Sequence, residues 1–241
     1  MTPLPRMAFV IPAWNEAGYL PATLDALHQA TDAAGLDAEI VVVDDASTDA
    51  TAALAVAGGA RVVQVACRQI AAARNAGAAA TTSPWLVFLD ADTHVDARLL
   101  RAASAALTSG AAGGGCTVRL DGARTWSVRL GVQLAAWLFR ALGIAPGCFL
   151  FCARAAFDAA GGFDEALFAG EDVAMSRALA ARGRFVILRE PVRTSGRKLA
   201  HASRWRQLRL LATFAWRGRR LLRDREALEL WYGGPDGRPP R

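Results

Sequence analysis

The stretch Glu39–Asp49 reads EIVVVDDASTD, an apolar run that ends in acidic and hydroxyl-bearing residues. A continuous run of this kind is typical of a strand that is buried on both faces of a parallel sheet. Similar runs at residues 8–11, 61–65 and 85–89 alternate with helical patterns. This alternation predicts a doubly wound α/β fold, with a mostly parallel central sheet and helices on both faces.

The pattern changes after residue 110, where the glycine-rich stretch GAAGGG interrupts it. No linker is long enough to separate a second domain, so we predict one domain over residues 1–230 and a disordered tail over 231–241. The strands predicted in the later half lie at 115–118, 147–152 and 185–188. Helices are predicted at 19–30, 49–57, 70–80, 96–107, 126–143, 174–182 and 204–223.

The positive charge is concentrated near the C-terminus. The net charge is +6, but residues 193–225 hold eleven basic residues and one acidic residue, whereas the rest holds seventeen basic and twenty-one acidic ones. We therefore predict that residues 204–226, which include the helical pattern at 204–223, form a basic amphipathic helix. Such a helix suits peripheral contact with an anionic membrane, and packing of its apolar side on the domain is the alternative.

The sequence has no uninterrupted run of about 18 apolar residues, and we expect no signal peptide, because the apolar run at residues 7–13 meets Pro12 too early. The expectation is a cytoplasmic protein, either soluble or at the inner face of the cell membrane.

Acidic residues follow three of the predicted strands, in the segments PAWNE (12–16), DDASTD (44–49) and DAD (90–92). In a parallel sheet these segments emerge at one edge, where ligands bind. Repulsion among several carboxylates there must be offset by a cation or by ligand donors. Capping of the next helix by Ser47–Asp49 is an alternative, but it does not explain the two adjacent acids Asp44 and Asp45.

Asp90 and Asp92 form a D-x-D pair. If the segment is extended, both carboxylates face the same side and can serve one hard cation such as Mg²⁺ or Mn²⁺. A turn or helix-capping role is the alternative. In the N-terminal half of the chain, Arg74 is the nearest cation to these acidic segments that could face a diphosphate. A solvated arginine on a helix is the alternative. Glu171 and Asp172 precede a short helix, where one of them could cap it or act as a general base.

These segments, taken in order, resemble the family 2 glycosyltransferases of the GT-A class. The match covers Ala8 to about Trp205. It rests on VIPAWNE (10–16), VVDDASTD (42–49), RNAG (74–77), FLDAD (88–92), GGFDE (161–165) and ED (171–172).

The resemblance implies a nucleotide-binding half over 1–110 and an acceptor half over 111–203, the latter a small extension of the sheet domain. It also implies direct displacement with inversion and a divalent cation, Mn²⁺ or Mg²⁺, as cofactor. The donor is a nucleotide sugar, for which UDP is the first choice of carrier and GDP and dTDP remain open. The acceptor is left open among a glycan, a lipid-linked molecule and a small molecule.

The resemblance further assigns residue roles. Pro12, Asn15 and Glu16 line the nucleotide pocket, and Asp44 and Asp45 bracket the base and ribose, with Asp45 as the base contact. Asp90 touches the ribose or the metal, and Asp92 coordinates the metal. Asp172 is the general base, assisted by Glu171. Arg204 and Trp205 resemble the end of a Q-x-x-R-W motif, although this chain has His201 where that motif has Gln. Together with Arg197, they are candidates for diphosphate or acceptor contacts.

Other classes fit the sequence less well. A sugar-phosphate nucleotidyltransferase would carry a glycine-rich first loop with basic residues, and this chain has PAWNE instead. A catalytically inactive, membrane-associated member of the fold is opposed by the presence of Asp90, Asp92 and Asp172. A nucleic-acid partner is opposed by the acidic sheet edge and by the lack of a nucleic-acid-binding motif.

Overall fold

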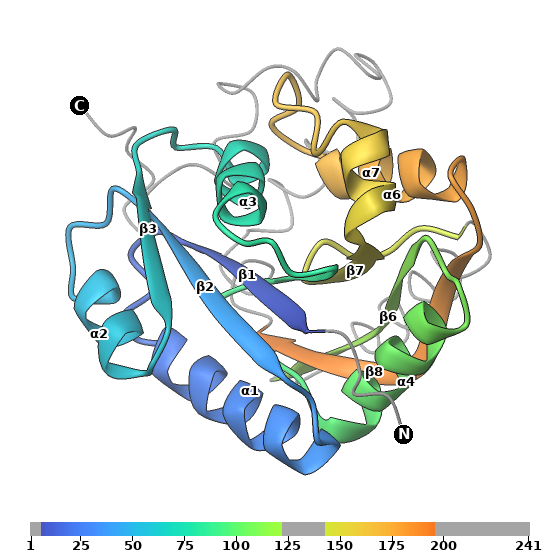
Figure 1. The fold of residues 1–241 in the computed structure, drawn as a ribbon. Coiled ribbons are helices and arrows are strands. Elements are labelled where there is room, and N and C mark those ends of the chain that lie inside the picture. The colour runs from blue at the N-terminus through green and yellow to red at the C-terminus, as the bar shows by residue number, and fades with distance from the viewer. Residues whose placement is uncertain (1–5, 122–142, 196–241) are drawn as a thin grey trace, which may run out of the picture.

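The computed structural model of the protein describes residues 6–121 and 143–195. One eight-stranded sheet runs through the molecule, with helices on both sides (Figure 1). The strands are β1 (Met7–Ala13), β2 (Ala38–Asp45), β3 (Arg61–Val65), β4 (Trp85–Leu89), β5 (Thr93–His94), β6 (Gly113–Asp121), β7 (Phe149–Ala153) and β8 (Phe185–Ser195). The helices are α1 (Leu20–Ala34), α2 (Thr51–Ala57), α3 (Ile70–Ala79), α4 (Ala97–Thr108), α6 (Arg154–Ala160) and α7 (Glu171–Ala180).

The sheet has the strand order β3-β2-β1-β4-β7-β6-β8-β5. The strands β3, β2, β1 and β4 are parallel to one another, and β6 is parallel to β8. The strand β7 is antiparallel to both β4 and β6, and β5 is antiparallel to β8. The N-terminal part is therefore the predicted parallel α/β unit, and β7 joins it to a mixed extension.

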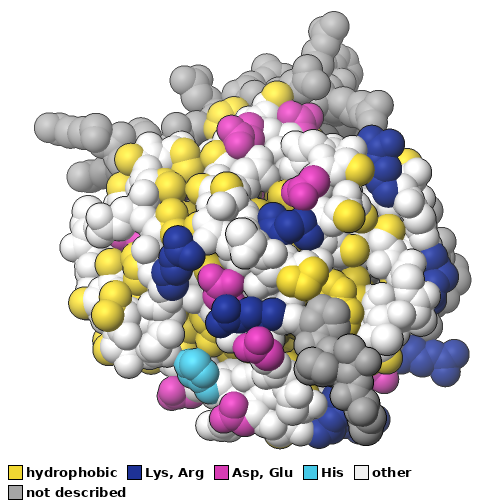
Figure 2. Space-filling model, viewed as in Figure 1, with side chains coloured by type: hydrophobic (Ala, Val, Ile, Leu, Met, Phe, Trp, Pro, Cys, Tyr) yellow, Lys and Arg dark blue, Asp and Glu magenta, His cyan; other side chains and the backbone are white. Residues whose placement is uncertain are grey.

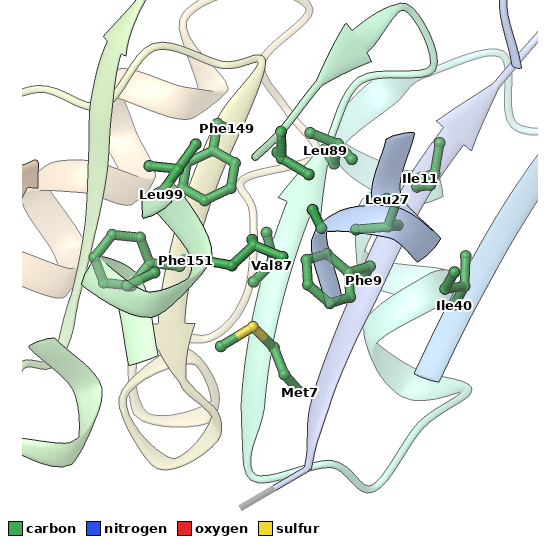
Figure 3. Packing of buried hydrophobic residues seen from close by; sticks show 14 of the residues in the cluster. Met7, Phe9, Ile11, Leu27, Ile40, Val87, Leu89, Leu99, Phe149 and Phe151 are labelled. Carbon is green, nitrogen blue, oxygen red and sulfur yellow. The ribbon is translucent and has the colours of Figure 1, made fainter. Parts of the chain in front are cut away.

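Alternating side chains of the strands supply two hydrophobic cores, one on each face of the sheet. In β1, Met7, Phe9 and Ile11 point to the core shared with α1 and α4, while Ala8 and Val10 point to the core shared with α3 and α7. Figure 3 shows the first of these cores, and Figure 1 shows α1, α2 and α4 on one side of the sheet and α3, α6 and α7 on the other. Both faces are covered, which explains why the central strands are continuously apolar.

The predicted elements agree with the structure in most places. The predicted bounds of β3 and β4 match those observed. The helix α7 begins at Glu171, three residues before its predicted start, and β8 extends to Ser195, beyond the predicted 188. The short elements β5 and α6 were not predicted. The predicted helices at 126–143 and 204–226 and the predicted tail lie outside the described residues, apart from Gly143.

Within the two described ranges, no helix is long and apolar enough to cross a membrane. On the face shown in Figure 2, acidic and basic side chains are interspersed rather than gathered into a patch of one sign.

The helix α3 approaches the sheet closely at Gly77. A Cβ atom added there would lie 2.3 Å from Val10 Cγ1 and 2.7 Å from Val43 Cγ2. Both distances are shorter than van der Waals contact, so any larger residue would push α3 away from β1 and β2. Since α3 also carries Arg74 and Asn75, this glycine fixes the depth at which both side chains enter the molecule.

We predict that Gly77→Ala lowers the free energy of unfolding by about 1–3 kcal/mol through overpacking, even though alanine is favoured in helices by about 1 kcal/mol. Chemical denaturation measures the change. Gly18→Ala is the control, because a Cβ there meets nothing within 4 Å. In the Val10→Ala background, which removes Val10 Cγ1, Gly77→Ala should lower the free energy of unfolding by less than it does in the original chain. A Gly77→Ala protein as stable as the original would disprove the close contact.

Candidate active site

The loops that follow β1 and β2 are joined by hydrogen bonds. The Asn15 amide donates to Ser47 Oγ (3.0 Å), and Asn15 Oδ1 accepts from the Thr48 amide (2.8 Å). The Glu16 amide donates to Thr51 Oγ1 (2.9 Å). Asn15 has a left-handed backbone with φ of 53°, a conformation that asparagine tolerates better than most residues. The predicted pocket residues Asn15 and Glu16 are thus held against the segment that follows β2, while Pro12 lies in β1 beside Val43.

Asp49 links the same two loops. It accepts hydrogen bonds from the Ala17 amide (3.2 Å) and the Thr51 amide (3.0 Å), and Thr51 Oγ1 also donates to it. Burial alone would raise the pKa of Asp49, but the hydrogen bonds from Thr51 and Ala17 outweigh it and lower the pKa. The cap residue of α2 is Ala50, whose side chain makes no capping bond. Asp49 therefore fastens the start of α2 from one position earlier.

Asp44 and Asp45 are both buried at the end of β2 but have different partners. Asp45 accepts hydrogen bonds from the amides of Arg68 (2.8 Å) and Gln69 (3.0 Å), which lie just before α3. Asp44 accepts one from the Ser47 amide (3.3 Å). The carboxylate of Asp45 thus holds the β3–α3 connection in place.

A stacked pair of side chains lies at this connection and leaves no signal in the sequence. The Arg68 guanidinium lies 3.6 Å from the centre of the Trp14 ring, and Arg68 has a left-handed φ of 50°. Trp14 Nε1 is buried and has no hydrogen-bond partner among the described residues. The adjacent Gln69 donates through Nε2 to the carbonyl oxygens of Glu165 and Leu167. Trp14 and Arg68 therefore form a cation–π pair, and the Arg68 amide connects this pair to Asp45.

The D-x-D pair lies in a turn, which is one of the two conformations that the sequence left open, and not in an extended segment. The strand β4 ends at Leu89, and the Thr93 amide donates to the carbonyl oxygen of Asp90 (3.1 Å). Asp90 Oδ1 accepts from Arg74 (3.1 Å). Asp92 Oδ2 accepts from Ser195 Oγ (2.6 Å), with Thr194 Oγ1 at 3.5 Å from Oδ1. The two acids therefore contact different elements, Asp90 meeting α3 and Asp92 the end of β8.

Arg74, the candidate to face a diphosphate, is 1% exposed, and its guanidinium contacts three segments. Nη1 donates to Glu171 Oε1 (3.0 Å), and Nη2 donates to Asp90 Oδ1 (3.1 Å) and the Gly147 carbonyl oxygen (2.7 Å). Burial would lower the pKa of Arg74, but the carboxylates of Asp90 and Glu171 outweigh it and raise the pKa. Arg74 is neither a solvated helix residue nor open to solvent, and protein acceptors occupy both of its Nη atoms.

The next residue, Asn75, holds the loop that contains the GGFDE segment. Asn75 Nδ2 donates to the Phe163 carbonyl oxygen (3.0 Å) and to Glu165 Oε1 (2.8 Å), while Asn75 Oδ1 accepts from the Phe163 amide (2.9 Å). Gly162 has φ of 77°, and a Cβ there would lie 2.9 Å from Asn75 Oδ1. The glycine pair of this segment thus permits both a left-handed turn and a close approach to α3.

Glu171 and Asp172 occupy the first turn of α7, where the helix dipole favours acidic side chains. Asp172 Oδ1 accepts from the Val173 amide (2.8 Å). Burial raises the pKa of Asp172 to about 6, the neighbouring Glu171 carboxylate adds to the rise, and Arg74 opposes it. Gly147 lies against this side chain, since a Cβ there would be 3.0 Å from Asp172 Oδ2. A carboxylate with this pKa can accept a proton near neutral pH.

The site therefore brings together Asp90, Glu171 and Asp172 around Arg74, with Asp92 reaching the end of β8 and Asp45 the start of α3. Among the described residues, no group of three or more His, Cys, Asp or Glu side chains is arranged to hold a metal ion. Arg197, Arg204 and Trp205 lie outside the described residues.

A match to the model of glycosyl transferase family 2 covers residues 8–159. The chain belongs to this family. The chain is 38% identical to the succinoglycan biosynthesis protein ExoO of Rhizobium meliloti over 102 residues, which cover 41% of this chain and 28% of that protein. An uncharacterized glycosyltransferase of Mycobacterium bovis is 40% identical over 102 residues, which cover 42% of this chain and 44% of the relative. The matched part is thus less than half of either relative.

Solved structures show the same fold, and the chain has the GT-A arrangement. TarS of S. aureus superposes with a TM-score of 0.64 at 17% identity, over 80% of this chain and 61% of TarS. The mannosyltransferase PcManGT of Pyrobaculum calidifontis, in complex with GDP-Man and Mn²⁺, gives a TM-score of 0.64 at 22% identity, over 80% and 57% of the two chains. Glucosyl-3-phosphoglycerate synthase of Mycobacterium tuberculosis, with Mn²⁺, UDP and its product, gives 0.59 at 20% identity, over 78% and 70%.

Proposed function

We propose that this chain transfers a sugar from a nucleoside-diphosphate sugar to an acceptor hydroxyl, with inversion at the anomeric carbon. The observation that carries the proposal is the position of Asp172. Its carboxylate is held at the start of α7, with a pKa of about 6, next to Glu171, which binds the same guanidinium as the strand-end acid Asp90. A base at this place can take the proton of the acceptor hydroxyl as its oxygen attacks the anomeric carbon.

The donor side of the site is assigned to the loops after β1 and β2. Asn15, Glu16 and Asp44 would line the nucleotide pocket, with Pro12 at its edge. Asp45 would fix the base-binding wall by holding the amides of Arg68 and Gln69. Several solved relatives of this fold carry nucleotides, such as TarS with UDP-GlcNAc and PcManGT with GDP-Man. A UDP-linked donor is the first choice.

Asp92, with Asp90 on the same turn, is the proposed ligand of a divalent cation. Carboxylate and hydroxyl oxygens surround this position, and hard cations prefer oxygen ligands. Mg²⁺ is often held by only one or two carboxylates together with substrate phosphates, so a larger cluster is not required. A bound Mn²⁺ or Mg²⁺ would offset the negative charge on the departing nucleoside diphosphate.

The acceptor remains a glycan, a lipid-linked molecule or a small molecule. Arg197, Arg204 and Trp205 stay candidates for diphosphate or acceptor contacts, and residues 204–226 stay a candidate for peripheral membrane contact.

We expect nucleotide-sugar hydrolysis or transfer for at least one donor in a panel of UDP, GDP and dTDP sugars, when Mn²⁺ is present. A chelator should stop the turnover, and Asp92→Ala should abolish it because the carboxylate that holds the cation is lost. Asp172→Asn should lower kcat by about 10²–10⁴-fold through loss of the general base. Asp158→Asn is the control, since its exposed side chain lies on α6.

Turnover that persists in the presence of chelator, or in Asp92→Ala, would refute the metal assignment. Nucleotide binding without turnover of any donor would instead favour a non-catalytic member of the fold.

The pH dependence of turnover tests Asp172 separately. A general base works only when it is ionised, so kcat should rise with pH through an apparent pKa of about 6 and level off above pH 7. A pH profile of kcat, measured at saturating donor and Mn²⁺, checks this. The residual activity of Asp172→Asn should lack this acidic limb. If the limb remains unchanged in that variant, another group is the base.

A further inference from the structure

We propose that Arg74 is a positioning residue that fixes the general-base side of the site relative to the donor side. The inference rests on the proposed sugar transfer. Arg74 contacts Asp90, which is 16 residues away in the sequence, and Glu171, which is 97 residues away. A single guanidinium thus sets the separation between the end of β4 and the start of α7.

The surroundings of Arg74 make this contact rigid. The side chain is almost fully buried, and the Phe163 ring centre lies 5.2 Å from the guanidinium carbon. Phe163 packs edge-on against Phe88 of β4, with ring centres 4.8 Å apart. The planar guanidinium holds its donors in a fixed fork, so Asp90 and Glu171 take defined directions rather than a range of them.

A third contact connects Arg74 with the general base. Nη2 donates to the Gly147 carbonyl oxygen, and the Cα of Gly147 faces the carboxylate of Asp172. Arg74 therefore fixes the positions of Asp90, of Glu171 beside the base, and of the Gly147 backbone that packs against Asp172. Movement of the guanidinium would shift all three at once.

Stability alone does not account for a buried arginine. Replacing a buried ion pair by apolar residues of similar volume is often neutral or stabilising, whereas removing one partner leaves an uncompensated charge. Arg74 Nε also has no hydrogen-bond partner among the described residues, which adds to the cost of burial. The role of Arg74 in holding Asp90 and Glu171 explains why a buried charge is present at this position. Asp90 lies on the proposed donor side of the site and Glu171 on the proposed base side.

Two variants separate charge from geometry. Arg74→Lys keeps a positive charge but lacks the fork, so it should reach one carboxylate and retain most of the melting temperature. Arg74→Met removes the charge and should lower the melting temperature clearly. We expect kcat to fall about 10²-fold in both, since misplacement of reacting groups by about 1 Å has this effect. Arg154→Met is the control, because Arg154 bonds to backbone carbonyls away from the site. It should keep its kcat.

A double variant tests the ion pair without any activity measurement. In Arg74→Met, the buried Glu171 carboxylate loses its partner, so adding Glu171→Gln should restore part of the lost melting temperature. In the original background, Glu171→Gln should lower it. If Arg74→Met fails to fold while the double variant folds, the Arg74–Glu171 ion pair is supported even more strongly.

Three results would overturn the proposal. One is that the melting-temperature losses of Arg74→Met and Glu171→Gln simply add. Another is that Arg74→Lys recovers kcat together with stability, which indicates a need for charge alone. The last is that Arg154→Met loses as much kcat as the Arg74 variants. If no donor is turned over at all, the proposed function fails, but the melting-temperature cycle still decides whether the bridge exists.

Discussion

The buried guanidinium of Arg74 adds polar contacts between parts of the chain that also share strand pairing and a hydrophobic core. It reaches from α3 to the end of β4, the segment before β7 and the first turn of α7. A cation in such a place is costly to bury unless several acceptors surround it, and here two carboxylates and a carbonyl do so. The acidic residues, which would repel one another, are thereby held near one point.

The helix α3 brings these contacts together because of three neighbouring residues in the segment RNAG. Gly77 lets the helix sit close to β1 and β2, Arg74 binds the acids, and Asn75 binds the loop that leads towards α7. The amides just before the helix are fixed by Asp45. The loops proposed to bind the donor and the loop proposed to carry the base therefore share α3 as one support.

The sequence predicted the central sheet well, because long apolar strands bounded by acidic or turn residues leave little choice of boundary. The bounds of β3 and β4 are examples. It predicted the grouping of Asp90, Glu171 and Asp172 only through the family resemblance. The burial of Arg74 was not predictable, since a helix position with small neighbours looks the same whether it faces solvent or the interior. The sequence left a turn and an extended segment open at Asp90–Asp92, because an acidic pair after a strand fits both equally well. The strand β5 has two residues and leaves no periodic pattern to detect.

The central claim is that the strand-end acids and the start of α7 line one donor site. The most direct measurement is an experimental structure of the chain with UDP and Mn²⁺ bound. The account predicts that the metal bridges Asp92 and the diphosphate, and that Asp172 lies on the same side, facing the end of the diphosphate. Binding of the nucleotide at a surface that is not lined by both Asp92 and Asp172 would contradict it.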